Sequence, residues 1–227
     1  MMTLSIIIPI FNEVKSIETL INKIDHLIIN NSGNRIIIVD DGSNDGTTEI
    51  LKRIKIDKPN LIIIHNDNNL GKGHAIKTGL QYVNGESVAL VDADEEVDVS
   101  IIFEWLSFYK PEIDAFIGIR EYEYVGNYFY FIGRFVLSAL FRILFYKNIQ
   151  DPLVGLKLIK SSVIKSMELR SNGFEIDSEI IIRLINGGYN FEQKPIKYTP
   201  RKINEGKKIR FYHAIKILSL WFKEALK

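Results

Sequence analysis

A mainly parallel α/β sheet, covered by helices on both faces, is predicted for this 227-residue chain by three observations. Apolar runs rich in Ile and Val alternate with segments of helical periodicity through the first half. The runs are continuous in their apolar character, as expected for strands buried on both faces. Polar clusters follow the runs, and the carboxyl ends of parallel strands are where ligands bind in such folds.

The predicted elements of the first half follow in chain order. Strands are expected at Leu4–Ile10, Arg35–Val39, Leu61–His65 and Ser87–Val91, and helices at Val14–Ile29, Thr47–Ile54 and His74–Tyr82. The second half is less regular and contains no repeat, low-complexity tract or clear linker. We therefore expect one domain over residues 1–227.

Composition excludes several classes of function. The chain has no Cys, which excludes disulfides, zinc–thiolate sites and thiol nucleophiles. Its net charge of +1 gives no reason to expect nucleic acid as a partner. The N-terminus lacks the features of a signal peptide, and no run of about 20 apolar residues predicts a transmembrane helix. These features favour a cytoplasmic location.

Two carboxylates follow the last of the four predicted strands. Asp92 and Asp94 flank the small residue Ala93, so both can face one cation where the strand ends. Hard oxygen ligands suit Mg²⁺ or Mn²⁺, which would also hold a diphosphate. A solvated acidic turn is the alternative, and the strand context favours the metal.

The second strand and a later loop supply further polar groups. Asp40 and Asp41 end the strand; one of them can accept hydrogen bonds from a nucleobase or ribose, and the other can cap the next helix. The segment Asn69–Gly73 offers flexible backbone beside Lys72, a candidate diphosphate contact. Neither a P-loop nor a dinucleotide fingerprint is present.

Four ordered motifs, SIIIPIFNE, IIIVDDGSNDGT, NLGKGHAIKTGL and VDADEEVD, resemble those of family-2 glycosyltransferases. The resemblance implies a GT-A fold, a nucleotide-sugar donor, and Mg²⁺ or Mn²⁺ on Asp92 and Asp94. Glu96, at a position where the motif departs from the usual pattern, is a third candidate ligand within reach of the metal. It makes residues 1–118 the nucleotide-sugar half and 119–227 the acceptor half. The residues it places around the donor and cation are Pro9, Phe11, Glu13, Val39, Asp41, Lys72, Asp92, Ala93 and Asp94.

Two segments of the second half favour peripheral membrane contact. Tyr128–Tyr146 is apolar except for Arg134, Ser138 and Arg142, which share one helix face at spacing i, i+4, i+8. Phe211–Lys227 is a second amphipathic segment with Lys on its polar side. Helices lying in the membrane interface explain both segments. The alternative is a core helix with Arg snorkelling to the surface, together with an ordinary amphipathic surface helix.

Further motifs resemble the polyprenol-phosphate (dolichol-phosphate) sugar synthase branch. They are Gly118-Ile119-Arg120, the Arg134–Ser138 pair and the segment 151–157, DPLVGLK. The resemblance implies GDP-mannose or UDP-glucose as donor, polyprenyl or dolichyl phosphate as acceptor, and a membrane subunit as an additional partner. It implies a catalytic set of Asp94, Arg120, Arg134 and Ser138, with Arg201 on the phosphates and Lys207 closing over the site.

Departures from the branch keep other functions open. Lys157 replaces the usual Arg, and Glu95-Glu96 replaces Leu-Gln. A glycan or other hydroxyl acceptor would need a general base, for which Asp177 and Glu179 are candidates. For both acids, a solvated position on a helix face is the favoured interpretation. A non-catalytic nucleotide- or membrane-binding subunit is the remaining alternative, and the intact motif residues argue against it.

Overall fold

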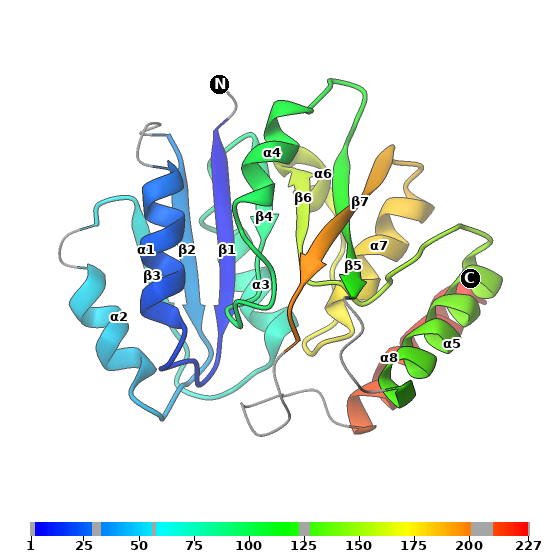
Figure 1. Ribbon diagram of the computed structural model, residues 1–227, viewed down its shortest axis with the longest axis horizontal. Coiled ribbons are helices and arrows are strands. Elements are labelled where there is room, and N and C mark those ends of the chain that lie inside the picture. The colour runs from blue at the N-terminus through cyan, green and yellow to red at the C-terminus, as the bar shows by residue number, and fades with distance from the viewer. Residues whose placement is uncertain (1–2, 29–32, 56–57, 123–127, 201–210, 227) are drawn as a thin grey trace.

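A computed structural model describes residues 3–28, 33–55, 58–122, 128–200 and 211–226. Within these ranges, seven strands form one sheet in the order β3-β2-β1-β4-β6-β5-β7 (Figure 1). The strands are β1 Leu4–Ile10, β2 Arg35–Asp40, β3 Leu61–His65, β4 Ser87–Leu90, β5 Ala115–Tyr122, β6 Lys157–Lys160 and β7 Phe191–Tyr198. The four strands predicted from sequence are confirmed, with ends that differ by no more than one residue.

All strands except β6 run in the same direction. The central strand β1 pairs in parallel with β2 and β4, whereas β6 is antiparallel to both of its neighbours, β4 and β5. The carboxyl ends of the parallel strands therefore lie along one edge of the sheet, the lower edge in Figure 1. The expectation of a mainly parallel sheet is confirmed.

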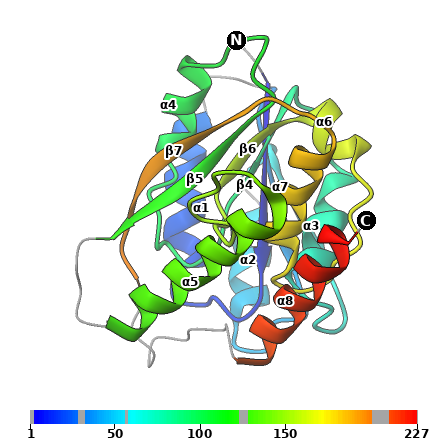
Figure 2. The same ribbon diagram turned by 90° about the vertical axis from the view of Figure 1, so that its right-hand side faces the viewer.

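Helices cover both faces of the sheet. Figure 2 shows α1 and α4 on one face and α3, α6 and α7 on the other. The helices are α1 Ile17–Ile28, α2 Thr47–Lys55, α3 Lys72–Leu80, α4 Ile101–Ser107, α5 Tyr128–Phe145, α6 Ser161–Ser166, α7 Ile176–Asn186 and α8 Phe211–Ala225. Helix α1 begins three residues later than predicted, because the carbonyl of Glu13 accepts the amides of Ser16 and Ile17 in a preceding turn.

The core lies between the sheet and these helices. In β1, six of the seven residues are buried, as expected for a strand covered on both faces. Helix α1 turns Ile17, Leu20, Ile21, Ile24 and Ile28 onto the sheet. Burying one such side chain stabilises the fold by about 1.5–3 kcal/mol, so this stripe holds α1 firmly in place.

Helices α5 and α8 pack against each other beside the β5–β7 end of the sheet (Figures 1 and 2). Phe141 of α5 and Trp221 of α8 meet edge to face, with ring centroids 4.9 Å apart. Arg183 of α7 pairs with Glu224, which ties α8 to the rest of the molecule. In the part of the chain that the structure describes, no helix is long and apolar enough to cross a membrane.

Candidate active site

A cavity of about 750 Å³ opens at the carboxyl edge of the sheet. Its wall combines the end of β1, the loop before α3, the turn after β4, β5, the start of α7 and α8. Sequence motifs far apart in the chain thus meet at one place. The predicted site residues that line the cavity are Pro9, Phe11, Glu13, Asp41, Lys72, Asp92, Ala93, Asp94, Glu96 and Arg120.

Two other predicted residues that the structure describes, Val39 and Ser138, do not line this cavity. Val39 is fully buried within β2 and is not part of the cavity wall. Ser138 is also buried, and its hydroxyl donates to the carbonyl of Gln150 at 2.8 Å. The role of Ser138 as a phosphate ligand stays a prediction. The side chain of Arg134, and Arg201 and Lys207 entirely, lie outside the described residues.

Asp40 and Asp41 have different roles. The sequence left open which of them caps the next helix and which faces a ligand. Asp40 is buried and accepts hydrogen bonds from the Ser43 amide at 3.0 Å and the Thr48 hydroxyl at 2.6 Å. Burial alone would raise the pKa of Asp40, but these hydrogen bonds outweigh it and lower the pKa. Asp40 therefore holds the turn into α2 as an anion, which leaves Asp41 for the cavity.

Asp41 fixes the loop that leads into α3. Its carboxylate accepts the amides of Leu70 at 3.0 Å and Gly71 at 2.6 Å, and the side-chain amide of Asn66 at 2.8 Å. Gly71 has a φ of 101°, and a Cβ there would lie 2.3 Å from the carbonyl oxygen of Asn172. Only glycine fits this close approach, so the loop places Lys72 in one position.

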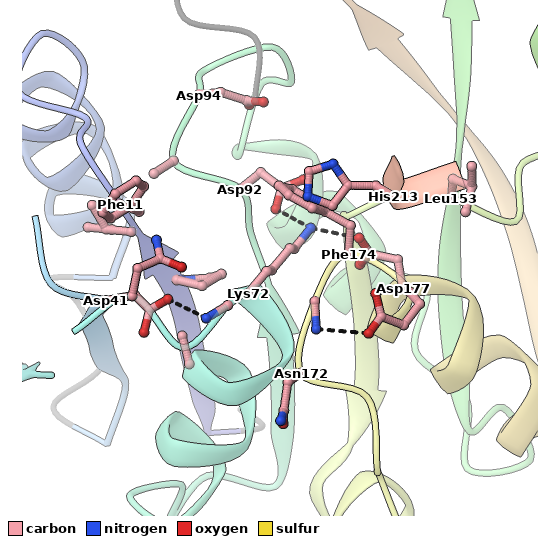
Figure 3. A pocket seen from close by; sticks show the side chains of 18 of the residues that line it. Phe11, Asp41, Lys72, Asp92, Asp94, Leu153, Asn172, Phe174, Asp177 and His213 are labelled. Carbon is pink, nitrogen blue, oxygen red and sulfur yellow. Dashed lines mark hydrogen bonds and ion pairs between the residues drawn. The ribbon is translucent and has the colours of Figure 1, made fainter. Parts of the chain in front are cut away.

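Lys72 belongs to a chain of four alternating charges, Asp92–Lys72–Asp177–Lys157. Its ammonium lies 2.5 Å from Oδ1 of Asp92 and 2.7 Å from Oδ2 of Asp177. The other oxygen of Asp177 accepts a hydrogen bond from Nζ of Lys157 at 3.1 Å. Figure 3 shows Lys72 reaching between the two carboxylates at the centre of the cavity. We call this set the lysine–aspartate chain.

Burial makes each charge of the lysine–aspartate chain depend on its neighbours. Burial would raise the pKa of Asp177, but the charges of Lys157 and Lys72 outweigh it and lower the pKa. Burial would lower the pKa of Lys72, yet Asp177 and Asp92 raise it. Desolvation of the fully buried Lys157 lowers its pKa. Asp177 is therefore an ion-paired carboxylate rather than a ready proton acceptor.

The prediction that Asp177 and Glu179 are solvated acids on a helix face is wrong. Their exposed fractions are 4% and 0%, because the first turn of α7 faces inward. Glu179 accepts the amides of Arg170 and Ser171, at 3.0 and 2.8 Å, and pairs with Arg183. It therefore anchors the segment before α7 rather than facing the cavity.

The three predicted metal ligands are not gathered around one point. Glu96 accepts the hydroxyl hydrogen of Tyr198, and Asp94 accepts the amide of Glu96 at 3.2 Å. In Figure 3 Asp94 lies apart from Lys72, with Asp92 between them. Within the described ranges, no cluster of three or more His, Asp or Glu side chains is close enough to hold a metal.

Glu96 also lines the cavity, with one carboxylate oxygen bound to Tyr198, and its role as a third ligand stays a prediction. Asp92 and Asp94 remain as two carboxylates on the cavity wall. One or two carboxylates, completed by phosphate oxygens and water, are a usual ligand set for Mg²⁺. The residues present thus fit a divalent cation that arrives together with a phosphorylated ligand.

Arg120 contributes a rigid cation to the cavity wall. Its Nε and one terminal nitrogen each lie 2.7 Å from an oxygen of Asp151, and its guanidinium stacks over Tyr198 at 5.2 Å. This two-point pairing fixes the plane of the guanidinium. The sequence predicted Arg120 but not its partner, because 31 residues separate the two.

Helix α8 also reaches the cavity, which the sequence did not predict. Tyr212, His213 and Lys216 line it, and His213 meets Phe174 edge to face with ring centroids 4.8 Å apart. The amphipathic pattern of this segment predicted which face of the helix is buried, including Ile217 and Trp221. It could not predict which parts of the chain that helix contacts. This part of the cavity wall is therefore built by the same helix that packs on α5.

Gly155 sets the position of Asp92. A Cβ at residue 155 would lie 1.9 Å from Oδ2 of Asp92, so the Gly155→Ala change must displace that carboxylate. A misplacement of about 1 Å in a reactive site can cost about a hundredfold in rate, and we expect a loss of this size in kcat/KM for the reaction at this site.

Steady-state kinetics and thermal denaturation check this expectation for Gly155→Ala. Gly133→Ala is the matched control, since a Cβ at Gly133 meets nothing within 4 Å. Unchanged activity of a folded Gly155→Ala variant would contradict the predicted role of Asp92.

Comparison with known proteins agrees with this geometry. The family model for glycosyl transferase family 2 matches residues 5–167, and the chain belongs to that family. The dolichol-phosphate mannosyltransferase of Pyrococcus furiosus is 27% identical over 194 residues, 80% of this chain and 53% of the relative. The dolichyl-phosphate beta-glucosyltransferase of Trichomonas vaginalis is 33% identical over 97 residues, 40% of this chain and 30% of that protein. The chain thus spans about half the length of the Pyrococcus relative.

Solved structures confirm the fold. The glucosyl-3-phosphoglycerate synthase of Mycobacterium tuberculosis, solved with UDP, superimposes with a TM-score of 0.75 at 18% identity, covering 99% of this chain and 80% of that one. The same enzyme has been solved with Mn²⁺, UDP and phosphoglyceric acid, with a TM-score of 0.73 at 18% identity, covering 99% of this chain and 78% of that one. The chain therefore has the GT-A-like α/β fold that its motifs implied.

Proposed function

We propose that this chain transfers a hexose from a nucleoside-diphosphate sugar, GDP-mannose or UDP-glucose, to polyprenyl or dolichyl phosphate. The observation that carries the proposal is the cavity itself, where Asp92 and Asp94 face a space that also contains Lys72 and Arg120. Oxygen ligands and fixed cations in one cavity suit a diphosphate and a second phosphate. The names of the Pyrococcus and Trichomonas relatives support the lipid phosphate as acceptor.

Asp92 and Asp94 would hold Mg²⁺ or Mn²⁺, as the two carboxylates after β4. When bound, the cation would offset the negative charge that develops on the leaving diphosphate. Structures of the Mycobacterium neighbour with Mn²⁺ and UDP support this proposal. On the same view, residues 1–118 bind the donor and residues 119–227 bind the acceptor, with Pro9, Phe11 and Glu13 on the donor side.

The reaction that fits these groups is attack by a phosphate oxygen on the anomeric carbon, with inversion. The oxygen–carbon bond forms as the bond from that carbon to the diphosphate breaks, and the nucleoside diphosphate leaves. A phosphate monoester is already anionic near neutral pH, so this reaction needs no general base. The ion-paired Asp177 and the anchoring Glu179 agree with a base-free route. Arg120 would orient the acceptor phosphate.

Release of nucleoside diphosphate tests the proposal. The purified protein is mixed with Mn²⁺ and either GDP-mannose or UDP-glucose, with and without polyprenyl phosphate. We expect release that requires the lipid phosphate, occurs with one of the two donors, and stops when EDTA removes the metal. Release that is independent of polyprenyl phosphate, or that proceeds equally in EDTA, would contradict the proposal.

We further propose that α5 and α8 contact the cytoplasmic face of the membrane. Both helices expose large apolar side chains, and Lys216 and Lys223 on α8 are exposed as well. Apolar groups beside Lys favour a surface of anionic lipid. Among the side chains of this helix pair that the structure describes, the large exposed apolar ones are Phe135, Val136, Ile143, Tyr212, Ile215 and Phe222.

The double variant Ile143→Asp/Phe222→Asp is expected to bind anionic vesicles at least about tenfold more weakly, because it replaces apolar contact with negative charge. Co-sedimentation with phosphatidylserine-containing vesicles measures the change. Phe108→Asp is the control, as Phe108 is 52% exposed at the end of α4, away from this helix pair. Equal loss in the control, or no loss in the double variant, would contradict the proposed membrane contact.

A further inference from the structure

The two carboxylates that share Lys72 differ sharply in their surroundings. The side chain of Asp177 is 5% exposed, and its second oxygen binds the fully buried Lys157. The side chain of Asp92 is 37% exposed and faces the cavity. Lys72 therefore has one fixed partner, Asp177, and one exchangeable partner, Asp92.

The exchangeable partner is also one of the two candidate cation ligands. Nζ of Lys72 lies 2.5 Å from Oδ1 of Asp92, which is the space that a cation bound to that oxygen would need. An ammonium and a divalent cation on one carboxylate oxygen would repel each other strongly at such a distance. Binding of a cation to Oδ1 of Asp92 therefore requires that Lys72 withdraw from that oxygen.

We propose that Lys72 is a built-in counter-ion that competes with the divalent cation for Asp92 and yields when a diphosphate arrives with the cation. The inference rests on the proposed function, since the cation belongs to it. The diphosphate supplies the negative charge that holds both cations at once. Asp177, kept in place by Lys157, retains the ammonium at the cavity after it leaves Asp92.

This arrangement couples the two ligands. Without nucleotide, the cation binds weakly because it must displace Lys72 from Asp92. With nucleotide, phosphate oxygens replace Asp92 as the partner of Lys72, so the displacement no longer weakens cation binding. By linkage, the cation must strengthen nucleotide binding by the same factor. Asp92 therefore stays paired with Lys72 until the donor binds. The diphosphate of the donor then completes the ligand set of the cation.

Titration of Mn²⁺ into nucleotide-free protein, followed by the loss of the free Mn²⁺ electron paramagnetic resonance signal, tests the inference. Lys72→Met is expected to bind Mn²⁺ about tenfold more tightly than the unmodified protein, because a competing charge is removed. Lys72→Arg keeps the charge and is expected to remain within about twofold of the unmodified protein. Lys77→Met is the matched control on the same helix, since Lys77 bonds Asn172 and does not line the cavity.

The outcomes separate this inference from the proposed function. If Lys72→Met binds Mn²⁺ no more tightly, while the unmodified protein binds Mn²⁺ in the presence of UDP or GDP, the competition is refuted and the metal-dependent function stands. If the unmodified protein binds no Mn²⁺ even with either nucleotide, both fail. Should Lys72→Met not fold, the unmodified protein still decides: equal Mn²⁺ affinity with and without nucleotide overturns the inference.

Discussion

Replacing Asp94 by Asn is expected to lower kcat/KM for sugar transfer by about 10²–10³-fold. The change removes the charge of one of the two candidate cation ligands, Asp92 and Asp94, while keeping the size of the side chain. Loss of one preorganised electrostatic contact to the reacting groups costs a factor of this order. Initial rates of nucleoside diphosphate release, measured over a range of Mn²⁺ concentrations, give the effect.

Asp98→Asn is the control for the Asp94 variant. Asp98 lies four residues further along, pairs with Lys23 at 2.9 Å, and is absent from the cavity wall. We expect it to leave the transfer rate within about twofold, as for an exposed ion pair. If Asp94→Asn retains full activity at low Mn²⁺ concentration, the assignment of the cation to this turn is wrong.

Replacing Asp177 by Asn is expected to lower the free energy of unfolding by about 3–5 kcal/mol, the cost of breaking a buried ion pair by removing one partner. The carboxylate binds two ammonium groups, and the side chains of Lys72 and Lys157 are 11% and 0% exposed. Without it, Lys157 loses the counter-ion that its burial requires. Urea denaturation followed by circular dichroism measures the change.

The same Asp98→Asn variant serves as the stability control. The side chains of Lys23 and Asp98 are 46% and 58% exposed, so their pair contributes at most about 1 kcal/mol. A loss below about 1 kcal/mol for Asp177→Asn would show that the buried charges are held by other means, and would remove the basis for a fixed partner of Lys72.

The first half of the fold follows from hydrophobic patterning alone. Continuous Ile-rich runs such as Leu4–Ile10 mark strands buried on both faces, and the helical stripe of α1 marks the layer above them. The second half does not follow in this way. Strand β6 has only four residues, and its antiparallel place between β4 and β5 depends on pairing across distant parts of the chain.

The candidate site likewise contains residues that the sequence predicted and contacts that it did not. Asp41, Asp92 and Asp94 were predicted because each follows a strand, and parallel strands end at one edge. The pairs Lys157–Asp177 and Arg120–Asp151 were not, because buried charges leave no periodic signal and their partners lie 20 and 31 residues apart. An acid in the first turn of α7 looks the same in sequence whether it faces water or a buried lysine.

The most direct test of the central claim is the partition of labelled sugar. The protein is incubated with Mn²⁺, polyprenyl phosphate and GDP-mannose or UDP-glucose that carries the label in the sugar, and the organic phase is then counted. The proposed function predicts label in the organic phase with one donor, dependent on Mn²⁺ and lost in Asp94→Asn. Label that stays in the aqueous phase, while nucleoside diphosphate is still released, would contradict the lipid-phosphate acceptor and point to a hydroxyl acceptor instead.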